Sequence, residues 1–428
     1  MKKGSSRTVW RSRIYARGLC ILAYIALCTL GFLLNQPLLV VVVSILSITV
    51  FLPVRKLGFI GRMFVVISAY MGANTLIAFL PWVFKINISA WLFSGFIFIV
   101  GLCFVIFCRF ARPDRWFSIG ETVSFIVAVT VFMLLSIQSF ATFRSPDLLK
   151  VVNGSGVDNV AHFAFTEAVS DQGGYLYGAR GSHLPINSML GAGANNYPQG
   201  YHINAWFFND ITQPFMGELT DINRKMVGFL LGSIINYSLL VFAFVFFAIQ
   251  MINLGGNKRD YLRLIVVVAC AIYVLLNLIF SIYTDGFIPQ VMSLHLMITT
   301  ILLLTMYCKE TEVWQKCTYG VLALLCVVGV GLSYFFLLPV VLGTFIITVI
   351  CDYFYSTSRA GLSIYWLITL LAGGMLSIAH GVVYVVLQNV TADKINDKGG
   401  VLMLDVFYVF SLAIFALAYL WHIRKKGV

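Results

Sequence analysis

The stretch that decides the fold is MVGFLLGSIINYSLLVFAFVFFAIQM, residues 226–251, which contains no charged side chain. A helix needs roughly 17–25 mostly apolar residues to cross the hydrocarbon core of a membrane. This stretch meets that requirement and predicts a membrane-spanning helix. The whole chain agrees, because 60% of its residues are hydrophobic and 11% are charged. Soluble domains average about 45–50% apolar and about 25% charged residues.

Other apolar runs of similar length occur along the chain. They cover residues 18–34, 37–54, 63–83, 90–107, 119–142, 264–282, 288–307, 317–334, 336–351, 362–388 and 403–421. The sequence therefore predicts an all-α polytopic membrane protein with about twelve transmembrane helices. The first run follows a basic segment, as a signal peptide would, but no A-x-A cleavage pattern follows it and a second run begins almost at once. We interpret it as the first membrane helix.

The net charge of +12 indicates membrane topology rather than a nucleic-acid partner. Most Lys and Arg residues lie in the short segments on one predicted side of the membrane, and such residues are enriched in short cytoplasmic loops. Both termini are therefore expected to be cytoplasmic, with attraction to anionic lipid headgroups as a secondary effect. The nine cysteines all lie in predicted helices or at their cytoplasmic ends, so neither a disulfide framework nor a CxxC metal site is expected.

One connection is much longer than the others and lies on the predicted outer side. It divides the chain into an N-terminal membrane region, 1–142, with five helices, the loop 143–225, and a C-terminal membrane region, 226–428, with seven. Loops longer than about 12–15 residues are uncommon unless they are functional or disordered. Tyr, Trp and Phe occur throughout this one, which argues against disorder. We expect the chemistry of the protein to be located here.

The loop opens with DNVAHFAFTEAVSDQGG, residues 158–174, which predicts a short helix. Asp158 is a typical N-cap residue, and the glycine pair that closes the stretch ends the helix. Asp158 and His162 are neighbours at i and i+4 on one face, whereas Glu167 points away. The carboxylate and the imidazole are therefore candidates for a joint function.

A second motif in the loop is YPQGYH, residues 197–202, followed by INAWFF. Pro198 favours an extended conformation at Tyr197, and Gly200 permits a turn. The aromatic segment after it suits the membrane interface. We expect His202 to be presented at the membrane surface and the aromatic segment to bring the loop back to the outer ends of the helices.

These motifs resemble those of a known class of enzyme. A long outer loop with D-x-x-x-H on a short helix (Asp158, His162) and then Y-P-x-G-x-H (197–202) resembles polytopic bacterial glycosyltransferases of the GT-C type. The turn SYFFLLP, residues 333–339, resembles an outer hairpin of such proteins. The resemblance implies an inverting glycosyltransferase. It would move a sugar from a polyprenyl-phosphate carrier to an envelope glycan or a lipid-linked acceptor, at the outer face of the cytoplasmic membrane.

The predicted catalytic residues are Asp158, His162 and His202. Displacement at an anomeric carbon needs a carboxylate to take the proton of the acceptor hydroxyl, and Asp158 fits this role. His162 would orient it or carry the proton. A carboxylate with two histidines could also bind a divalent cation, although no metal site or cofactor is firmly predicted.

Negative charge grows on the departing phosphate, so a cation should lie near it. Arg224 is the preferred candidate because it lies where a lipid headgroup would be, with Lys225 and Arg180 as alternatives. Further candidate substrate contacts are Tyr197, Tyr201, Tyr334, His295 and His380. The last two histidines fall in the outer halves of predicted spans, where ionisable side chains tend to face a cavity or a partner.

Simpler interpretations stay open for each residue. Asp158 could serve only as a helix cap, YPQGYH could be a rigid turn that seats aromatic anchors, and His295 and His380 could be core packing. Asp285 is expected to be an ordinary turn residue. The other acids of the loop are expected to be solvated: Glu167, Asp171, Asp210, Glu218 and Asp221.

Three other functional classes also remain. A transporter or flippase for a lipid-linked glycan would show internal repeats and broken helices with charged groups at mid-bilayer. No clear repeat is visible, and the acids gather in one loop. A polysaccharide polymerase or ligase would have a similar number of helices, but a later loop that is richer in arginine. A scaffold without catalysis would tolerate Asp158→Asn.

Overall fold

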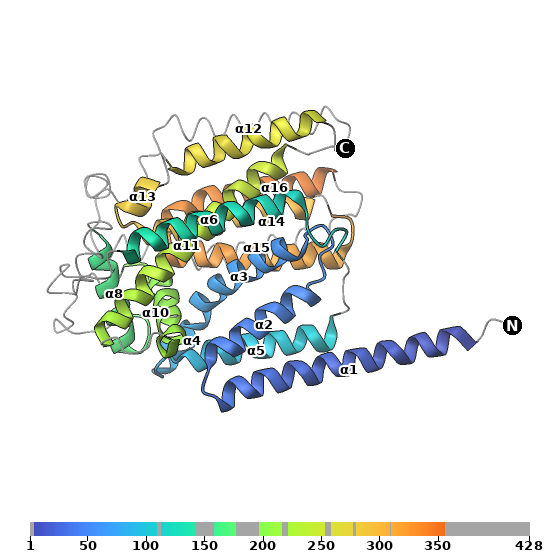
Figure 1. The fold of residues 1–428 in the computed structure, drawn as a ribbon, viewed down its shortest axis with the longest axis horizontal. Helices are drawn as coiled ribbons and strands as arrows, with labels where there is room; N and C mark the ends of the chain where they lie inside the picture. Colours follow the sequence, from blue (N-terminus) through green and yellow to red (C-terminus); the bar gives the residue numbers. More distant parts are fainter. Residues whose placement is uncertain are drawn as a thin grey trace. The chain divides into compact units, whose positions relative to one another are not determined.

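The computed structural model describes residues 4–108, 113–141, 158–176, 197–215, 221–252, 258–276, 280–308 and 310–355. Contacts divide the chain into two units, Met1–Gly381 and Val382–Val428, and every described residue lies in the first. Of the described residues 86% are helical and none forms a strand, which confirms the all-α prediction for this part of the chain (Figure 1).

The helices run in the following order. They are α1 (Gly4–Leu33), α2 (Pro37–Phe51), α3 (Phe59–Ile77), α4 (Phe79–Phe84), α5 (Ala90–Phe107), α6 (Ile119–Ala141), α8 (Asn159–Gln172), α10 (Gly200–Thr212), α11 (Asp221–Met251), α12 (Lys258–Val274), α13 (Phe280–Thr284), α14 (Ile288–Cys308), α15 (Val313–Tyr334) and α16 (Leu338–Tyr355). The short 3-10 helices η3 (Gln213–Phe215) and η5 (Phe335–Leu337) follow α10 and α15.

In the described residues, the apolar runs predicted before residue 356 fall largely on helices, and seven stretches are long and apolar enough to cross a membrane. They are Tyr15–Leu33, Phe59–Phe84, Ala90–Phe107, Ile119–Phe140, Ile222–Met251, Ile288–Cys308 and Val313–Thr348. The chain is therefore a multi-pass helical membrane protein. Helices α2 and α12, which cover the predicted runs 37–54 and much of 264–282, are not among the seven, and the predicted runs 317–334 and 336–351 both fall largely in Val313–Thr348. The predicted runs 362–388 and 403–421 lie outside the described residues, so the total of twelve spans stays a prediction.

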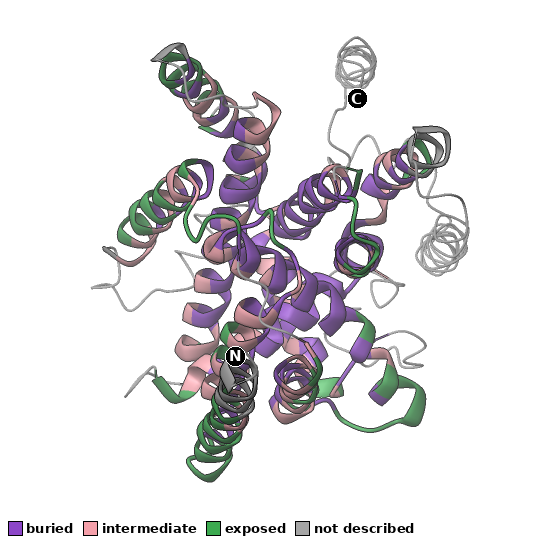
Figure 2. Cartoon of the chain, turned by 90° about the vertical axis from the view of Figure 1, so that its right-hand side faces the viewer, coloured by how far each residue is buried: buried purple, intermediate pink, exposed green. Residues whose placement is uncertain are grey.

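Burial differs between the helices in the way that a membrane requires. Buried residues gather where helices meet, while peripheral helices expose their outer faces (Figure 2). The exposed faces of α1, α6 and α12 are apolar, with Leu22, Leu134 and Ile265 each more than half exposed. Apolar side chains that point outward in this way are suited to contact with lipid.

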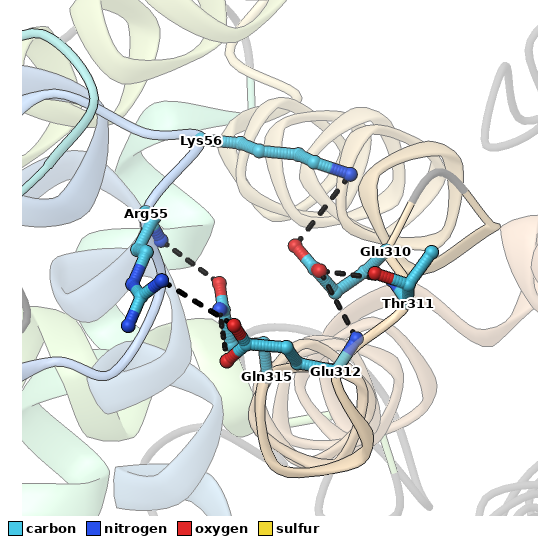
Figure 3. A network of polar contacts seen from close by, with 6 residues as sticks. All are labelled: Arg55, Lys56, Glu310, Thr311, Glu312 and Gln315. Atoms are coloured by element: carbon cyan, nitrogen blue, oxygen red, sulfur yellow. Dashed lines mark hydrogen bonds and ion pairs between the residues drawn. The ribbon is translucent and has the colours of Figure 1, made fainter.

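Polar contacts join two connections at one end of the bundle. Arg55 and Lys56, between α2 and α3, pair with Glu312 and Glu310, between α14 and α15, at 3.3 and 3.5 Å. Gln315 accepts a hydrogen bond from the Arg55 backbone nitrogen at 3.0 Å (Figure 3). These two connections, both predicted to be cytoplasmic, therefore lie together.

Helix α3 carries the chain from this end to the other. Its 19 residues rise by roughly 28 Å. Near its far end, the Thr75 carbonyl accepts a hydrogen bond of 2.6 Å from Tyr175, which follows α8. The described parts of the long loop therefore lie at the end opposite the basic connections, as the predicted topology requires.

Helices α3 and α15 cross in close contact at two glycines. A Cβ atom on Gly72 would overlap the Leu325 carbonyl oxygen, and one on Gly329 would lie 2.9 Å from the Gly72 Cα. Small residues allow membrane helices to approach this closely.

This crossing leads to a prediction for Gly72→Ala. The added methyl group meets backbone rather than a flexible side chain, so we expect a loss of about 1–3 kcal/mol in unfolding free energy. Gly95→Ala is the matched control, because no heavy atom lies within 4 Å of a Cβ atom there. Thermal unfolding in detergent should show a lower Tm for Gly72→Ala and an unchanged or higher Tm for Gly95→Ala. An equal fall in both variants would contradict the crossing.

Candidate functional site

Helix α8 forms where the sequence predicts it. It runs from Asn159 to Gln172 and ends at Gly173, whose φ of +66° is left-handed and suits glycine. Asp158 occupies the N-cap position, but its side chain makes no capping hydrogen bond. A capping hydrogen bond therefore does not explain the carboxylate at this position.

Helix α10 is a buried helix and not a surface turn. Gly200, expected to form a turn, is its first residue, and a Cβ atom there would lie only 2.7 Å from the Ser333 hydroxyl of α15. Asn204 donates to the Met71 carbonyl of α3 at 3.1 Å. Helix α10 also contacts α8, α11 and α14. The loop therefore returns to the bundle, as expected. Its helix α10 packs between these helices.

His202 is consequently 0% exposed. The prediction that it lies at the membrane surface is wrong. Aromatic residues are common both at a membrane interface and in a protein interior. Here Gly200 allows α10 to pack closely against α15, and this packing buries His202 in the interior.

The structure brings His162 and His202 together. The Nδ1 atom of His162 lies 3.1 Å from the Nε2 atom of His202, and both rings are buried. One of the two nitrogens must donate a proton and the other must accept it. The i, i+4 spacing in the sequence instead predicts that the His162 side chain pairs with that of Asp158. Those two residues are joined by a backbone hydrogen bond of 2.9 Å from His162 to the Asp158 carbonyl.

Aromatic rings surround the two histidines. The ring centroids of Phe165 and Tyr201 lie 5.0 and 5.3 Å from that of His202, and Tyr197 lies 5.9 Å from His162. The Tyr201 hydroxyl lies 3.1 Å from that of Ser233 in α11. Tyr201 is fully buried, whereas Tyr197 is only half-buried. Of these two predicted substrate contacts, Tyr197 is the more accessible.

Burial determines the charge of the pair. It lowers the pKa of His162 to about 3. Burial and the neighbouring His162 lower the pKa of His202 well below its ordinary value, against the opposing effect of the Pro198 carbonyl. Both imidazoles are therefore neutral near pH 7.

Asp158 has the properties of a carboxylate with increased proton affinity. Its side chain is half-buried, and burial together with the charge of Asp285 raises its pKa above the ordinary value. Such a carboxylate is a stronger base once it is ionised. Asp285 lies in a turn, as expected, where the Gly286 nitrogen donates to the Tyr283 carbonyl at 3.1 Å.

Lys225 forms an ion pair with Glu167 of α8 at 2.6 Å, and both side chains are about four-fifths buried. The prediction that Glu167 is solvated is wrong, because α11 packs close enough to α8 for this pair to form. Lys225 therefore has a protein partner for its charge. Arg224 is half-buried in the first turn of α11, and Arg180 lies outside the described residues.

The remaining acids of the loop differ in their environments. Asp171 is exposed, as predicted. Asp210 is half-buried, so the expectation of a solvated side chain is wrong, and burial raises its pKa against a hydrogen bond from the Ala90 backbone. Glu218 lies outside the described residues, and the structure describes only the backbone of Asp221.

The other predicted substrate contacts lie in the bundle. His295 is 0% exposed, and its Nε2 atom lies 2.8 Å from the Ser68 hydroxyl of α3. This hydrogen bond runs to a membrane span and not to α8 or α10. Tyr334 is buried at the end of α15, before the η5 turn predicted at 333–339. His380 lies outside the described residues.

Metal coordination has little support among the described residues, where no group of three or more His, Cys, Asp and Glu side chains is placed to hold an ion. The two histidine nitrogens that face each other already share a hydrogen bond. Asp158 and the two histidines are therefore not arranged as the predicted alternative of a divalent-cation site.

Comparison with known proteins gives no assignment. No family model, curated protein or solved structure matches the chain.

Proposed function

We propose that the protein is an inverting glycosyltransferase of the GT-C type. It transfers a sugar from a polyprenyl-phosphate-linked donor to an envelope glycan or lipid-linked acceptor at the outer face of the cytoplasmic membrane. The observation that supports this best is a half-buried carboxylate, Asp158, with a raised pKa and no capping bond, at the end of the bundle away from the basic connections.

Asp158 supplies the base in this proposal. An acceptor hydroxyl gives its proton to the Asp158 carboxylate while its oxygen attacks the anomeric carbon. The bond between that carbon and the phosphate oxygen breaks, and its electron pair leaves with the phosphate. Attack from the face opposite the phosphate inverts the configuration.

The histidine pair acts through α8 in this scheme. His162 lies one turn after Asp158 and is held by His202 at 3.1 Å. Because both rings are neutral and buried, they are suited to fixing the position of α8 and not to carrying charge. We therefore assign His162 and His202 as positioning residues, in place of the catalytic roles expected from the sequence.

Arg224 is the proposed phosphate contact, because it is half-buried in the first turn of α11, where the sequence predicts a lipid headgroup. Its neighbour Lys225 forms an ion pair with Glu167. A charge-assisted hydrogen bond is worth about 1.5–3 kcal/mol, which corresponds to roughly 10- to 100-fold in binding.

The two adjacent cations should behave differently when replaced. We expect Arg224→Met to raise the donor KM by about 10- to 100-fold. Lys225→Met should leave the donor KM within about threefold of wild type and lower the Tm, because a partly buried Glu167 loses its partner. Steady-state kinetics and thermal unfolding of both variants test this. A reversed pattern would move the phosphate contact to Lys225.

The function can be tested in the source organism. Deletion of the gene should remove one sugar from an envelope glycan and cause its lipid-linked donor to accumulate, and the wild-type gene should restore both. Mass spectrometry of the glycans and lipid carriers measures the outcome. Unchanged glycans and carriers in the deletion strain would reject the proposal.

A transporter or flippase for a lipid-linked glycan is the second candidate. Two observations favour it: the buried His295 and Ser68 join two membrane spans, and η5 interrupts the apolar stretch Val313–Thr348. A transporter would move the lipid-linked glycan without changing it chemically. A polymerase or ligase would use related donor chemistry and would be recognised by its longer products.

A further inference from the structure

The turn before α14 is fitted closely against the start of α8. Gly286 has φ +87°, a left-handed conformation that glycine adopts most readily. A Cβ atom on Gly286 would lie 2.7 Å from the Asn159 nitrogen and 3.1 Å from the Asp158 nitrogen. Both conformation and space therefore require glycine, and the turn can approach the backbone of α8 only because glycine is present.

This turn carries Asp285 next to Asp158. The Phe287 nitrogen donates to the Ile282 carbonyl at 3.0 Å, and the Ile288 nitrogen donates to the Gly286 carbonyl at 2.8 Å. These hydrogen bonds fix the turn to both α13 and α14. Asp285 is exposed and its charge acts on the half-buried Asp158. The close approach of Gly286 to the Asp158 and Asn159 nitrogens thus places Asp285, one residue earlier, beside the start of α8.

We propose that Asp285 is a positioning residue for the base of the transfer reaction, because the Gly286 turn holds its negative charge beside the start of α8, where Asp158 lies. The effect on the reaction rests on the proposed function. The electrostatic interaction between the two carboxylates is independent of the proposed function, because it depends only on their positions.

Among the described residues, Asp285 is the charged group that raises the pKa of Asp158. His162 and His202 are neutral, and Lys225 is paired with Glu167. The other titratable side chains described on α8, α10, α11 and the turn before α14 are Asp171, Tyr201, Asp210, Arg224, Tyr237 and Tyr283. Burial and Asp285 are the two causes that raise the proton affinity of Asp158, and burial is the larger.

The experiment is residue-specific carbodiimide labelling of the purified protein over a range of pH. The reagent modifies protonated carboxyl groups, so labelling of Asp158 falls as pH rises through its titration. In Asp285→Asn we expect this fall to occur at lower pH. At a fixed pH within the falling part of the wild-type curve, labelling of Asp158 should be about two- to fivefold lower. Asp285→Glu should retain the wild-type curve, and Asp171→Asn is the control at the far end of α8.

Unchanged Asp158 labelling in Asp285→Asn, with wild-type unfolding behaviour, would overturn the proposal. The same variants also distinguish a failure of this proposal from a failure of the proposed function. If Asp158 is the base, the acidic limb of the transfer rate should move to lower pH in Asp285→Asn together with the labelling curve. A shifted labelling curve with no transferase activity in wild type would reject the function and leave the carboxylate coupling intact.

Discussion

Replacement of Asp158 with Asn should lower the rate of sugar transfer by about 10²–10⁴-fold, because the acceptor hydroxyl then has no carboxylate to take its proton. Donor binding should change little, since an amide of the same shape remains. Steady-state kinetics with a lipid-linked donor in detergent or proteoliposomes measures both quantities.

Two comparisons make this prediction specific. Asp171→Asn removes an exposed acid from the same helix and should retain full activity. Loss of a true N-cap typically costs about 0.5–2 kcal/mol, whereas the Asp158 side chain makes no capping bond. We therefore expect the Tm of Asp158→Asn to match that of wild type. Normal activity in Asp158→Asn would remove this residue from the mechanism.

The second large effect should come from the buried histidine pair. His202→Phe leaves the Nδ1 atom of His162 without its partner in a buried site, which costs about 1–3 kcal/mol. His162→Phe should cost a similar amount. The double variant should be more stable than the sum of the two single losses predicts, because each single change already breaks the same hydrogen bond.

Thermal or denaturant unfolding in detergent completes this double-mutant cycle. His295→Phe is the control, because its hydrogen bond runs to Ser68, and its effect should add to that of His202→Phe. Additive losses for His162 and His202 would contradict a shared hydrogen bond.

The same pair gives a pH dependence. The pKa of His162 is about 3 in the folded protein, and an unfolded histidine has a pKa of about 6.5. The unfolded state therefore binds more protons than the folded state between these values, and stability should be lost as pH falls from about 6.5 toward 3. Unfolding midpoints measured across this range should fall less steeply in the double Phe variant.

The sequence predicted those features that depend on local patterns. Apolar runs located most of the described helices before residue 356, and Asp158 with the glycine pair at 173–174 located α8. Helix length and termination follow from neighbouring residues, so composition and spacing are sufficient. The same local pattern placed the Asp158 carboxylate at the start of α8.

Contacts between distant segments could not be predicted. The spacing of Asp158 and His162 suggested a side-chain pair, but the His162 ring turns to His202, which α10 brings from another part of the loop. The ion pair of Lys225 with Glu167 and the approach of the Gly286 turn to α8 likewise depend on helix packing. No signal in either segment alone identifies its partner.

The most direct test of the account follows the chemical fate of a lipid-linked donor. Proteoliposomes containing wild-type protein or Asp158→Asn would be incubated with an isotopically labelled polyprenyl-phosphate sugar and a glycan acceptor, and the products analysed by mass spectrometry. The account predicts free polyprenyl phosphate and a glycosylated acceptor of inverted configuration with wild type, and neither with Asp158→Asn. Equal conversion by both proteins, or a donor that crosses the bilayer chemically unchanged, would contradict it.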